Sequence, residues 1–284
     1  MGRTARRGWS AGLQACPVST VQEYRYGQHP SQFVRLHLPP EGRVPVAVVL
    51  HGGFWRAAYG IELAEPLARD LVGFGIAAAA VEYRRVGDGG GWPTTMADVA
   101  RAVDHLATAG QYVARNRLQL DRVAAVGHSA GGQLAAWLTH RRSLRAGTAG
   151  SITTASEHVP IIGAVSQAGV LDMAGASHER LGNGAVDALM QGAARSVPQR
   201  YHHSSPLAHV GDGAAVVCIH GDADDVVPLS QSQRYVDAAV LAGDPARLVT
   251  LPGVDHMQLV DVHDEAWSVC RDAVLRMVSG GGDR

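Results

Sequence analysis

The chain has 284 residues, a formal net charge of −1 and 46% hydrophobic residues, and 18% of its residues are charged. This length and apolar content suffice for a sizeable buried core, and they predict one large α/β domain rather than two small ones. Because the charges nearly balance, no global field attracts the protein to nucleic acid or to an anionic membrane. The composition therefore predicts partners that are small and close to neutral.

The three cysteines, Cys16, Cys218 and Cys270, are odd in number, far apart and without CxxC spacing. This pattern argues against a disulfide framework or a zinc site and fits a reducing cytoplasm. The N-terminal stretch has a twin-arginine look, but no apolar run of signal-peptide length follows it, and no run approaches transmembrane length. We therefore predict a flexible N-terminal arm over residues 1–25 and a cytoplasmic location.

From residue 44 onward, apolar β-rich runs alternate with segments of helical spacing. An apolar run that ends in glycines is typical of a strand buried on both faces of a parallel sheet. The predicted strands cover 44–53, 76–85, 122–127, 161–169, 214–221 and 247–253. The predicted helices cover 61–73, 94–110, 130–141, 229–243 and part of 261–279, with Thr94 or Thr95 as the N-cap of the second. The alternation predicts a mostly parallel central sheet flanked by helices on both faces.

Two stretches interrupt this alternation. Residues 143–159 are polar and rich in small residues, and residues 170–212 are long enough to form an insertion over the carboxyl edge of the sheet. Loops at that edge usually carry function. We predict a single domain over residues 26–284, with residues 170–212 as a small cap insertion.

Residues 127–132 read GHSAGG and stand between an apolar strand and a helix. A sharp turn at this place forces the serine into strained backbone geometry, so Gly127, Ala130 and Gly131 must be small. The Ser129 hydroxyl then projects above the sheet beside a helix N-terminus, whose N–H groups can stabilise an oxyanion. In this context the G-x-S-x-G string predicts Ser129 as a nucleophile.

A serine nucleophile needs a base that is itself oriented by an acid. The segments HGDADDVVP (220–228) and PGVDHMQL (252–259) each follow a predicted strand and so lie at the same edge as Ser129. We predict His256 as the base and Asp224 as the acid. Three neighbours, Asp222, Asp225 and Asp255, are expected to cap turns or to point elsewhere, and Asp172 is an outside candidate for the acid.

The HGGFW segment at 51–55 follows an early strand, where the second set of oxyanion donors is expected. Its two glycines allow the backbone to approach the substrate oxygen closely. We predict the N–H groups of Gly53, Phe54 and Ala130 as the oxyanion hole, the alternative being a plain glycine turn at HGG.

Taken in this order, HGGFW, GHSAGG, HGDADDVVP and DH resemble the α/β-hydrolase superfamily over about residues 30 to 280. HGG followed by an aromatic residue and Trp, then VEYRR and WPTTMADVARAVDHL, resembles the branch of kynurenine formamidase (arylformamidase) and the hormone-sensitive-lipase-like esterases. The resemblance implies Ser129, Asp224 and His256 as a catalytic triad, an oxyanion hole in the HGG loop, and no cofactor. Phe54 replaces the third glycine of the lipase-like HGGG, which favours the formamidase-like group and leaves ester preference open.

The predicted reaction is hydrolysis of a small carboxylic ester or an activated amide through an acyl-enzyme. The triad alone does not choose between the two, so specificity is expected to lie in the cap. The side chains predicted to bind the substrate are Trp55, His128, Met173 and Tyr201, with Phe54, Leu181, Leu189 and Met190 as further lining candidates. The same apolar side chains fit an ordinary core equally well. A homodimer is compatible with the sequence.

Other functions remain as alternatives. One is a small-ligand binder without turnover on the same fold, and an intact Ser, His and Asp set argues against it. Another is a small dipeptidase-like member, because HGDADDVVP also resembles the acid loop of the prolyl oligopeptidases, but the chain has no room for their propeller domain. A metal site from His178, Glu179, His202 and His203 fits no common ligand spacing, so no metal is predicted.

Overall fold

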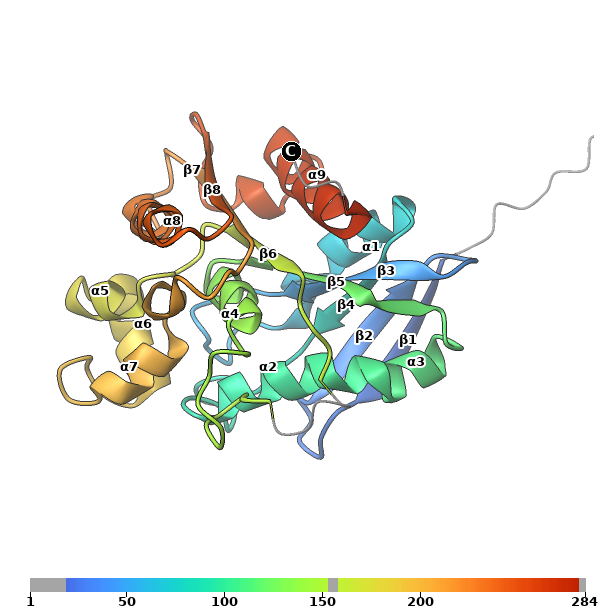
Figure 1. Cartoon of the computed structure of the whole chain (residues 1–284), viewed down its shortest axis with the longest axis horizontal. Coiled ribbons are helices and arrows are strands. Elements are labelled where there is room, and N and C mark those ends of the chain that lie inside the picture. Colours follow the sequence, from blue (N-terminus) through green and yellow to red (C-terminus); the bar gives the residue numbers. More distant parts are fainter. Residues whose placement is uncertain (1–18, 153–157, 281–284) are drawn as a thin grey trace, which may run out of the picture.

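The computed structural model describes residues 19–152 and 158–280, and these residues build one eight-stranded sheet (Figure 1). The strand order is β1-β2-β4-β3-β5-β6-β7-β8. Strands β2 to β4 are Phe33–Leu38, Val44–Leu50 and Ala77–Val81, and they follow β1 at Thr20–Arg25. Strands β5 to β8 are Leu118–His128, Gly163–Gln167, Val216–Gly221 and Ala246–Leu251. All pairings from β4 to β8 are parallel, and β2 runs antiparallel to both β1 and β4, so the predicted α/β-hydrolase fold class is confirmed.

The β1–β2 hairpin corrects the sequence prediction at the N-terminus. Residues 20–25 fall in the predicted arm but form the edge strand β1, in register with β2 through pairs such as Tyr24 with Val34. Five of the six β1 residues are exposed, so the strand carries little of the apolar signal that marks the inner strands. The rest of the predicted arm, up to residue 18, lies outside the described residues.

Helices cover both faces of the sheet, as predicted (Figure 1). Their bounds are α1 Glu65–Gly73, α2 Thr94–Asp104, α3 Ala109–Val113, α4 Ala130–Thr139, α5 Met173–His178, α6 Leu181–Met190, α7 Pro198–Ser204, α8 Ser230–Ala242 and α9 Glu265–Ser279. Alternate residues of an inner strand point to opposite faces. In β3, Val46 and Val48 therefore join the core beneath α2 and α4, whereas Ala47 and Val49 join the core beneath α1 and α9.

The helix predicted over 94–110 is divided. Helix α2 ends at Asp104, and a short turn at His105–Ala107 leads into α3. The N-cap prediction at Thr94 or Thr95 is wrong, because the N-cap is Pro93. The Thr95 hydroxyl instead accepts a hydrogen bond from Gly91 N–H and donates one to the carbonyl of Arg84, which holds the preceding loop.

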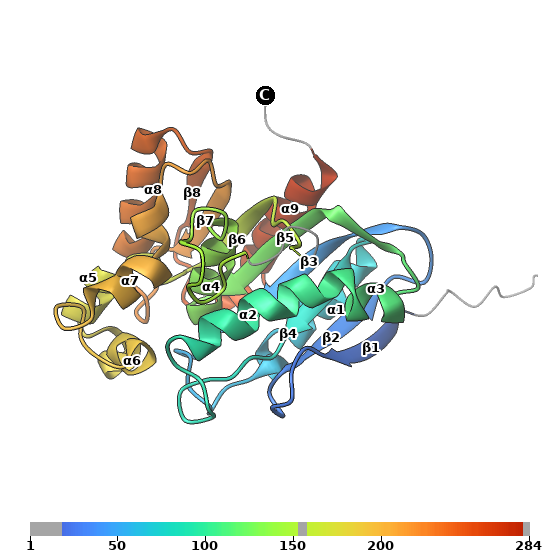
Figure 2. The same cartoon turned by 60° about the horizontal axis from the view of Figure 1, so that its bottom comes forward.

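The long stretch between β6 and β7 holds α5, α6, α7 and a turn at Pro206–His209. Figure 2 shows these helices gathered at one end of the molecule, beside α8. Hydrogen bonds tie the segment to the loops after β3 and β4: the Arg56 guanidinium donates to the carbonyl of Gly182 (2.6 Å), and Trp92 N–H donates to that of Leu189 (2.7 Å). Among the described residues, no helix has the length and apolar content needed to cross a bilayer.

Candidate active site

Ser129 lies at the tip of a tight turn between β5 and α4. Its backbone has φ 56° and ψ −118°, a left-handed conformation that costs a residue with a side chain about 1–3 kcal/mol. The turn is so close that a Cβ on Gly127 would lie 2.1 Å from the carbonyl oxygen of Gly131, and a Cβ on Gly131 would lie 2.1 Å from that of Leu50. The glycines of GHSAGG are therefore required by packing, and the strained serine stands at the carboxyl edge of the sheet.

Asp224 and His256 meet at the same edge. Asp224 lies in the β7–α8 loop and His256 follows β8, and the His256 Nδ1–H donates to Asp224 Oδ2 over 2.6 Å. The other carboxylate oxygen accepts the N–H groups of Val226 and Val227 at 2.9 and 2.8 Å. This arrangement leaves His256 Nε2 unprotonated in the neutral ring and available to act as a base.

Burial of Asp224 acts to raise the pKa of its carboxyl group. Hydrogen bonds from His220, from His256 and from Val227 N–H outweigh that effect and hold this pKa well below its usual range. Asp224 is therefore a carboxylate at neutral pH.

The neighbouring acids have other partners. Asp222 accepts the N–H of Gly253, and Asp255 accepts those of Met257 and Gln258. Asp172 caps α5 through Gly175 N–H and pairs with Arg234. Of the acids considered in the sequence, the structure thus brings Asp224 to His256.

His128 links the serine turn to the His256 loop. The two imidazole rings have centroids 4.3 Å apart, and His128 Nε2 lies 2.9 Å from the carbonyl oxygen of His256. Since a carbonyl only accepts, Nε2 carries the proton of the His128 ring. Burial, with a contribution from His256, lowers the pKa of His128 to about 3, so the ring is neutral. His128, the residue before Ser129, thereby holds His256 near the serine turn.

The HGGFW loop lies against this turn. A Cβ on Gly52 would be 3.0 Å from the carbonyl oxygen of His128 and 3.3 Å from the Ser129 Cβ. Gly53, Phe54 and Trp55 all have positive φ, of 102°, 51° and 54°. Trp55 is fully buried, and its Nε1–H donates to Gln133 of α4 over 3.2 Å, which anchors the strained loop.

The N–H groups predicted as oxyanion donors have no hydrogen-bond acceptor among the described residues. Within the described part of the chain, the backbone N–H groups of Gly53, Phe54 and Ala130 donate to no other residue. Unpaired donors at the first turn of a helix and in an adjoining loop are suited to bind an anionic oxygen.

A buried ionic network, which was not predicted from the sequence, includes His51 of the HGGFW loop. Glu82, at the end of the β4 segment, accepts hydrogen bonds from His51 Nε2 (3.1 Å), Arg85 Nη1 (2.6 Å) and Ile61 N–H (3.0 Å). The Tyr83 ring stacks on His51 at 4.4 Å. The sequence signal for this network is the charged EYRR string directly after an apolar strand. Charged side chains that are buried at the end of a strand need partners of opposite charge or hydrogen bonds.

A second histidine that the sequence reading passed over touches Asp224. His220, the last but one residue of β7, is fully buried, and its Nε2 lies 3.3 Å from Asp224 Oδ2 and 2.9 Å from the carbonyl oxygen of Val227. Its Nδ1 lies 2.8 Å from the hydroxyl of Ser232 in α8. The sequence signal is a histidine near the end of an apolar strand, because such a residue is buried and buried polar groups are usually hydrogen-bonded.

The four side chains predicted to bind the substrate are all buried, and this role stays a prediction for them. Trp55 and His128 have the contacts described above, and Met173 is fully buried at the start of α5. The Tyr201 hydroxyl donates to the Asp187 carboxylate (2.7 Å), and Tyr201 is among the residues that line a cavity of about 310 Å³ between α5 and α7.

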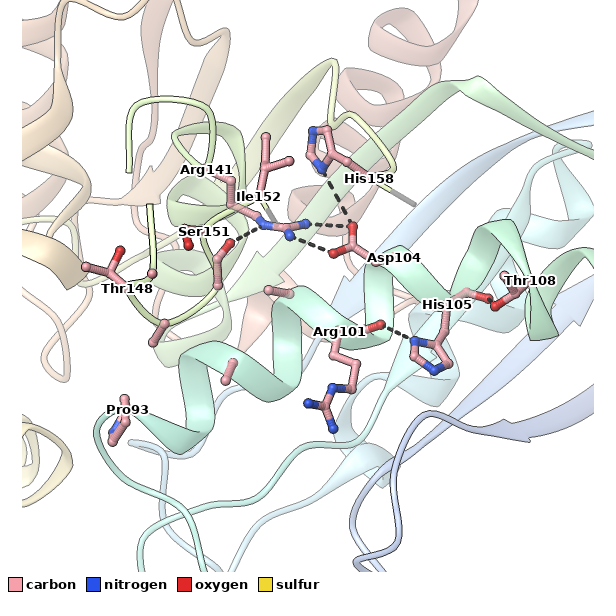
Figure 3. A pocket seen from close by; sticks show the side chains of 15 residues that line it. Pro93, Arg101, Asp104, His105, Thr108, Arg141, Thr148, Ser151, Ile152 and His158 are labelled. Carbon is pink, nitrogen blue, oxygen red and sulfur yellow. Dashed lines mark hydrogen bonds and ion pairs between the residues drawn. The ribbon is translucent and has the colours of Figure 1, made fainter. Parts of the chain in front are cut away.

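A larger cavity, of about 640 Å³, lies between α2 and the segment after α4 (Figure 3). Its charged wall is an internal ion pair in which Arg141 donates to both carboxylate oxygens of Asp104, at 2.9 and 2.6 Å. Arg141 follows the C-terminal end of α4, whereas Ser129 precedes its first residue, so the length of the helix separates them by roughly 15 Å. This cavity therefore does not belong to the Ser129 site.

No group of three or more histidine, cysteine, aspartate or glutamate side chains in residues 19–152 and 158–280 is arranged to hold a metal ion. Cys218 and Cys270 are free and buried, and Cys16 lies outside the described residues.

Comparison with known proteins agrees with this architecture. The chain is similar to the probable carboxylic ester hydrolase LipM of Mycobacterium tuberculosis (strain ATCC 25618 / H37Rv), with 26% identity over 239 residues, which are 82% of this chain and 54% of that protein. A probable isoprenylcysteine alpha-carbonyl methylesterase of Oryza sativa subsp. japonica is 26% identical over 249 residues, covering 82% of this chain and 56% of that protein. The chain thus spans about half the length of the curated relatives it matches.

Two solved structures have the same fold. A truncated form of a carbohydrate esterase from gut microbiota has a TM-score of 0.77 and 21% identity, with 93% of this chain and 98% of that chain covered. Esterase Est2 of the Planctomycetes species Thermogutta terrifontis has a TM-score of 0.72 and 20% identity, with 94% of each chain covered.

The family assignment comes from a family model rather than from these pairwise similarities. The model of the BD-FAE family matches residues 35–238, a span that contains the HGGFW loop, the serine turn and the Asp224 loop. The chain has the α/β-hydrolase fold and belongs to the BD-FAE family.

Proposed function

We propose that this protein is a serine hydrolase that cleaves a small carboxylic ester through an acyl-enzyme. The observation that carries the proposal is the Asp224–His256 pair, which contacts His128, the residue before the strained Ser129. Relatives named as ester hydrolases and methylesterases support an ester as the substrate class. An activated amide of the N-formyl arylamine type, as the arylformamidase resemblance implies, is the second substrate to test.

In the proposed mechanism His256 Nε2 takes the proton of the Ser129 hydroxyl as its oxygen attacks the ester carbonyl. The N–H groups of Gly53, Phe54 and Ala130 stabilise the oxyanion, and Asp224 stabilises the imidazolium that forms. His256 then protonates the leaving alkoxide, which departs as the alcohol. Water, activated by the same histidine, attacks the acyl-enzyme and releases the carboxylic acid.

The test is hydrolysis of p-nitrophenyl esters of increasing acyl length and of an N-formyl arylamine, together with labelling by a fluorophosphonate probe. We expect ester turnover and a label on Ser129. Ser129→Ala should fold normally and lose at least about a thousandfold in kcat, the scale on which triad residues act. A folded Ser129→Ala variant with the wild-type rate would refute the proposal.

The acid is tested by a matched pair of substitutions. Asp224→Asn should lose far more activity than Asp222→Asn, because Asp224 bonds to the His256 ring and Asp222 bonds only to the N–H of Gly253. If Asp222→Asn lost more, the assignment of the acid would move to Asp222.

A further inference from the structure

The Asp224 carboxylate has two imidazole neighbours rather than one. Oδ2 receives the His256 Nδ1–H at 2.6 Å and also faces His220 Nε2 at 3.3 Å. His220, Asp224 and Ser232 have fully buried side chains, so water cannot replace a contact that is lost among them. His220 is therefore in a position to affect the orientation of the Asp224 carboxylate.

The protonation pattern of His220 follows from its partners. Nε2 lies 2.9 Å from the carbonyl oxygen of Val227, which can only accept, so Nε2 carries a proton. This N–H donates to the Val227 carbonyl, and the Asp224 carboxylate lies 3.3 Å from the same nitrogen. In the neutral ring Nδ1 is then an acceptor, and the Ser232 hydroxyl at 2.8 Å donates to it. Ser232 thereby selects the tautomer that His220 needs.

The position of His220 allows it to fix the acid loop. Asp224 begins the turn and Val227 ends it, and one nitrogen of His220, Nε2, contacts both ends. His220 is itself held in β7 and by Ser232 of α8, the two elements that flank the loop. The backbone N–H groups of Val226 and Val227 hold only the other oxygen, Oδ1.

We propose that His220 is a positioning residue for hydrolysis: its Nε2–H holds Asp224 Oδ2 in line with His256, and Ser232 keeps the proton on that nitrogen. The inference rests on the proposed function, because it acts through the Asp224–His256 pair. His220 contacts Asp224, Val227 and Ser232 and does not touch the reacting atoms. Its effect is therefore expected on kcat rather than on KM.

The test compares two amides at this position. In His220→Gln the amide nitrogen can reach the place of Nε2, whereas in His220→Asn it reaches only the place of Nδ1, near Ser232. With a small p-nitrophenyl ester, we expect His220→Asn to lose about 10- to 100-fold in kcat with little change in KM, a loss typical of coupled neighbours. His220→Gln should recover most of that loss. His140→Gln is the matched control, since His140 is also fully buried and bonds to the Asp212 carboxylate through Nδ1 at 2.9 Å, a place that the glutamine amide does not reach.

A double-mutant cycle separates positioning from a general effect on the fold. If His220 acts through Asp224, His220→Asn should cost little further activity in an Asp224→Asn background. Equal losses in both backgrounds would overturn the proposal, as would a folded His220→Asn variant with wild-type kcat. If His220→Asn does not fold, Ser232→Ala replaces it in the cycle, with an expected loss of about two- to tenfold in kcat that vanishes beside Asp224→Asn.

The single variants keep the two proposals apart. Full activity of Ser129→Ala or of Asp224→Asn would remove the proposed triad itself. Loss of activity in both, together with additive behaviour of His220→Asn, would leave the triad standing and remove only the role of His220.

Discussion

The imidazole of His128 is neutral because it is buried against another histidine. Its pKa falls from 6.5 to about 3, whereas in the unfolded chain the ring titrates at the ordinary value. Between these two pH values the unfolded chain binds a proton that the folded protein does not. The free energy of unfolding therefore decreases as the pH falls through this window. The contribution of the neutral His128 ring to stability is lost completely only near pH 3.

This gives a prediction for stability. His128→Gln keeps a donor for the His256 carbonyl but cannot titrate, so its unfolding free energy should depend less steeply on pH. The wild type should lose about 2 kcal/mol more than the variant between pH 6.5 and pH 5. Urea denaturation across that range measures the difference, with His202→Gln as a control at an exposed histidine. Parallel curves for wild type and His128→Gln would contradict the neutral state of His128.

At the scale of elements, the junction of β5 with α4 is limited by backbone contacts rather than by side chains. The space beside the Gly131 Cα is filled by carbonyl oxygens of Leu50 and His51, at 2.1 and 2.6 Å from where a Cβ would lie. Backbone atoms of a central strand cannot move aside as a flexible side chain can. The helix is thereby held as close to β3 as the chain permits.

We predict that Gly131→Ala lowers the free energy of unfolding by at least about 2 kcal/mol, within the range of overpacking in a core. Gly73→Ala is the control, because Gly73 is helical and has open space around it. Chemical denaturation of both variants checks this. Equal stability of the two would mean that the junction is looser than described.

The sequence indicated the inner strands well, and the reason is their burial on both faces. Strand β3 is an apolar run in which six of the seven residues are buried. Strand β1 was not predicted because five of its six residues are exposed, and β2 was not predicted because Arg35 and His37 interrupt its apolar residues. The site shows the same division: Ser129, Asp224 and His256 stand in recognisable strings, whereas no string shows that His220 turns toward Asp224 or that Glu82 meets His51 and Ile61. Only the folded chain shows which buried groups meet.

At the scale of the whole molecule, the helical segment between β6 and β7 is attached to the loop that carries the predicted oxyanion donors. The Arg56 guanidinium donates to the Gly182 carbonyl and lies 5.9 Å from the centre of the Phe54 ring. That ring packs on Gly182, where a Cβ would lie 2.5 Å from Cε1. Movement of this segment would therefore change the position of Phe54.

We predict that Arg56→Ala raises KM for a long-chain p-nitrophenyl ester about fivefold, which corresponds to one lost hydrogen bond of about 1 kcal/mol. The acetate ester, which extends less far from Ser129, should be affected less. Arg69→Ala is the control, since that exposed arginine pairs with Glu65 on α1. An equal change of KM for both esters would show that this segment does not select among acyl chains.

The order of the strands also has a consequence during synthesis. The serine turn follows β5, but His256 follows β8, which can pair only after β7 is in place. A nascent chain that stops before β8 thus contains the nucleophile without its base. With the proposed triad, hydrolytic activity begins only when the last strand docks, and translation products that stop before β8 are inert toward the esters of the cell.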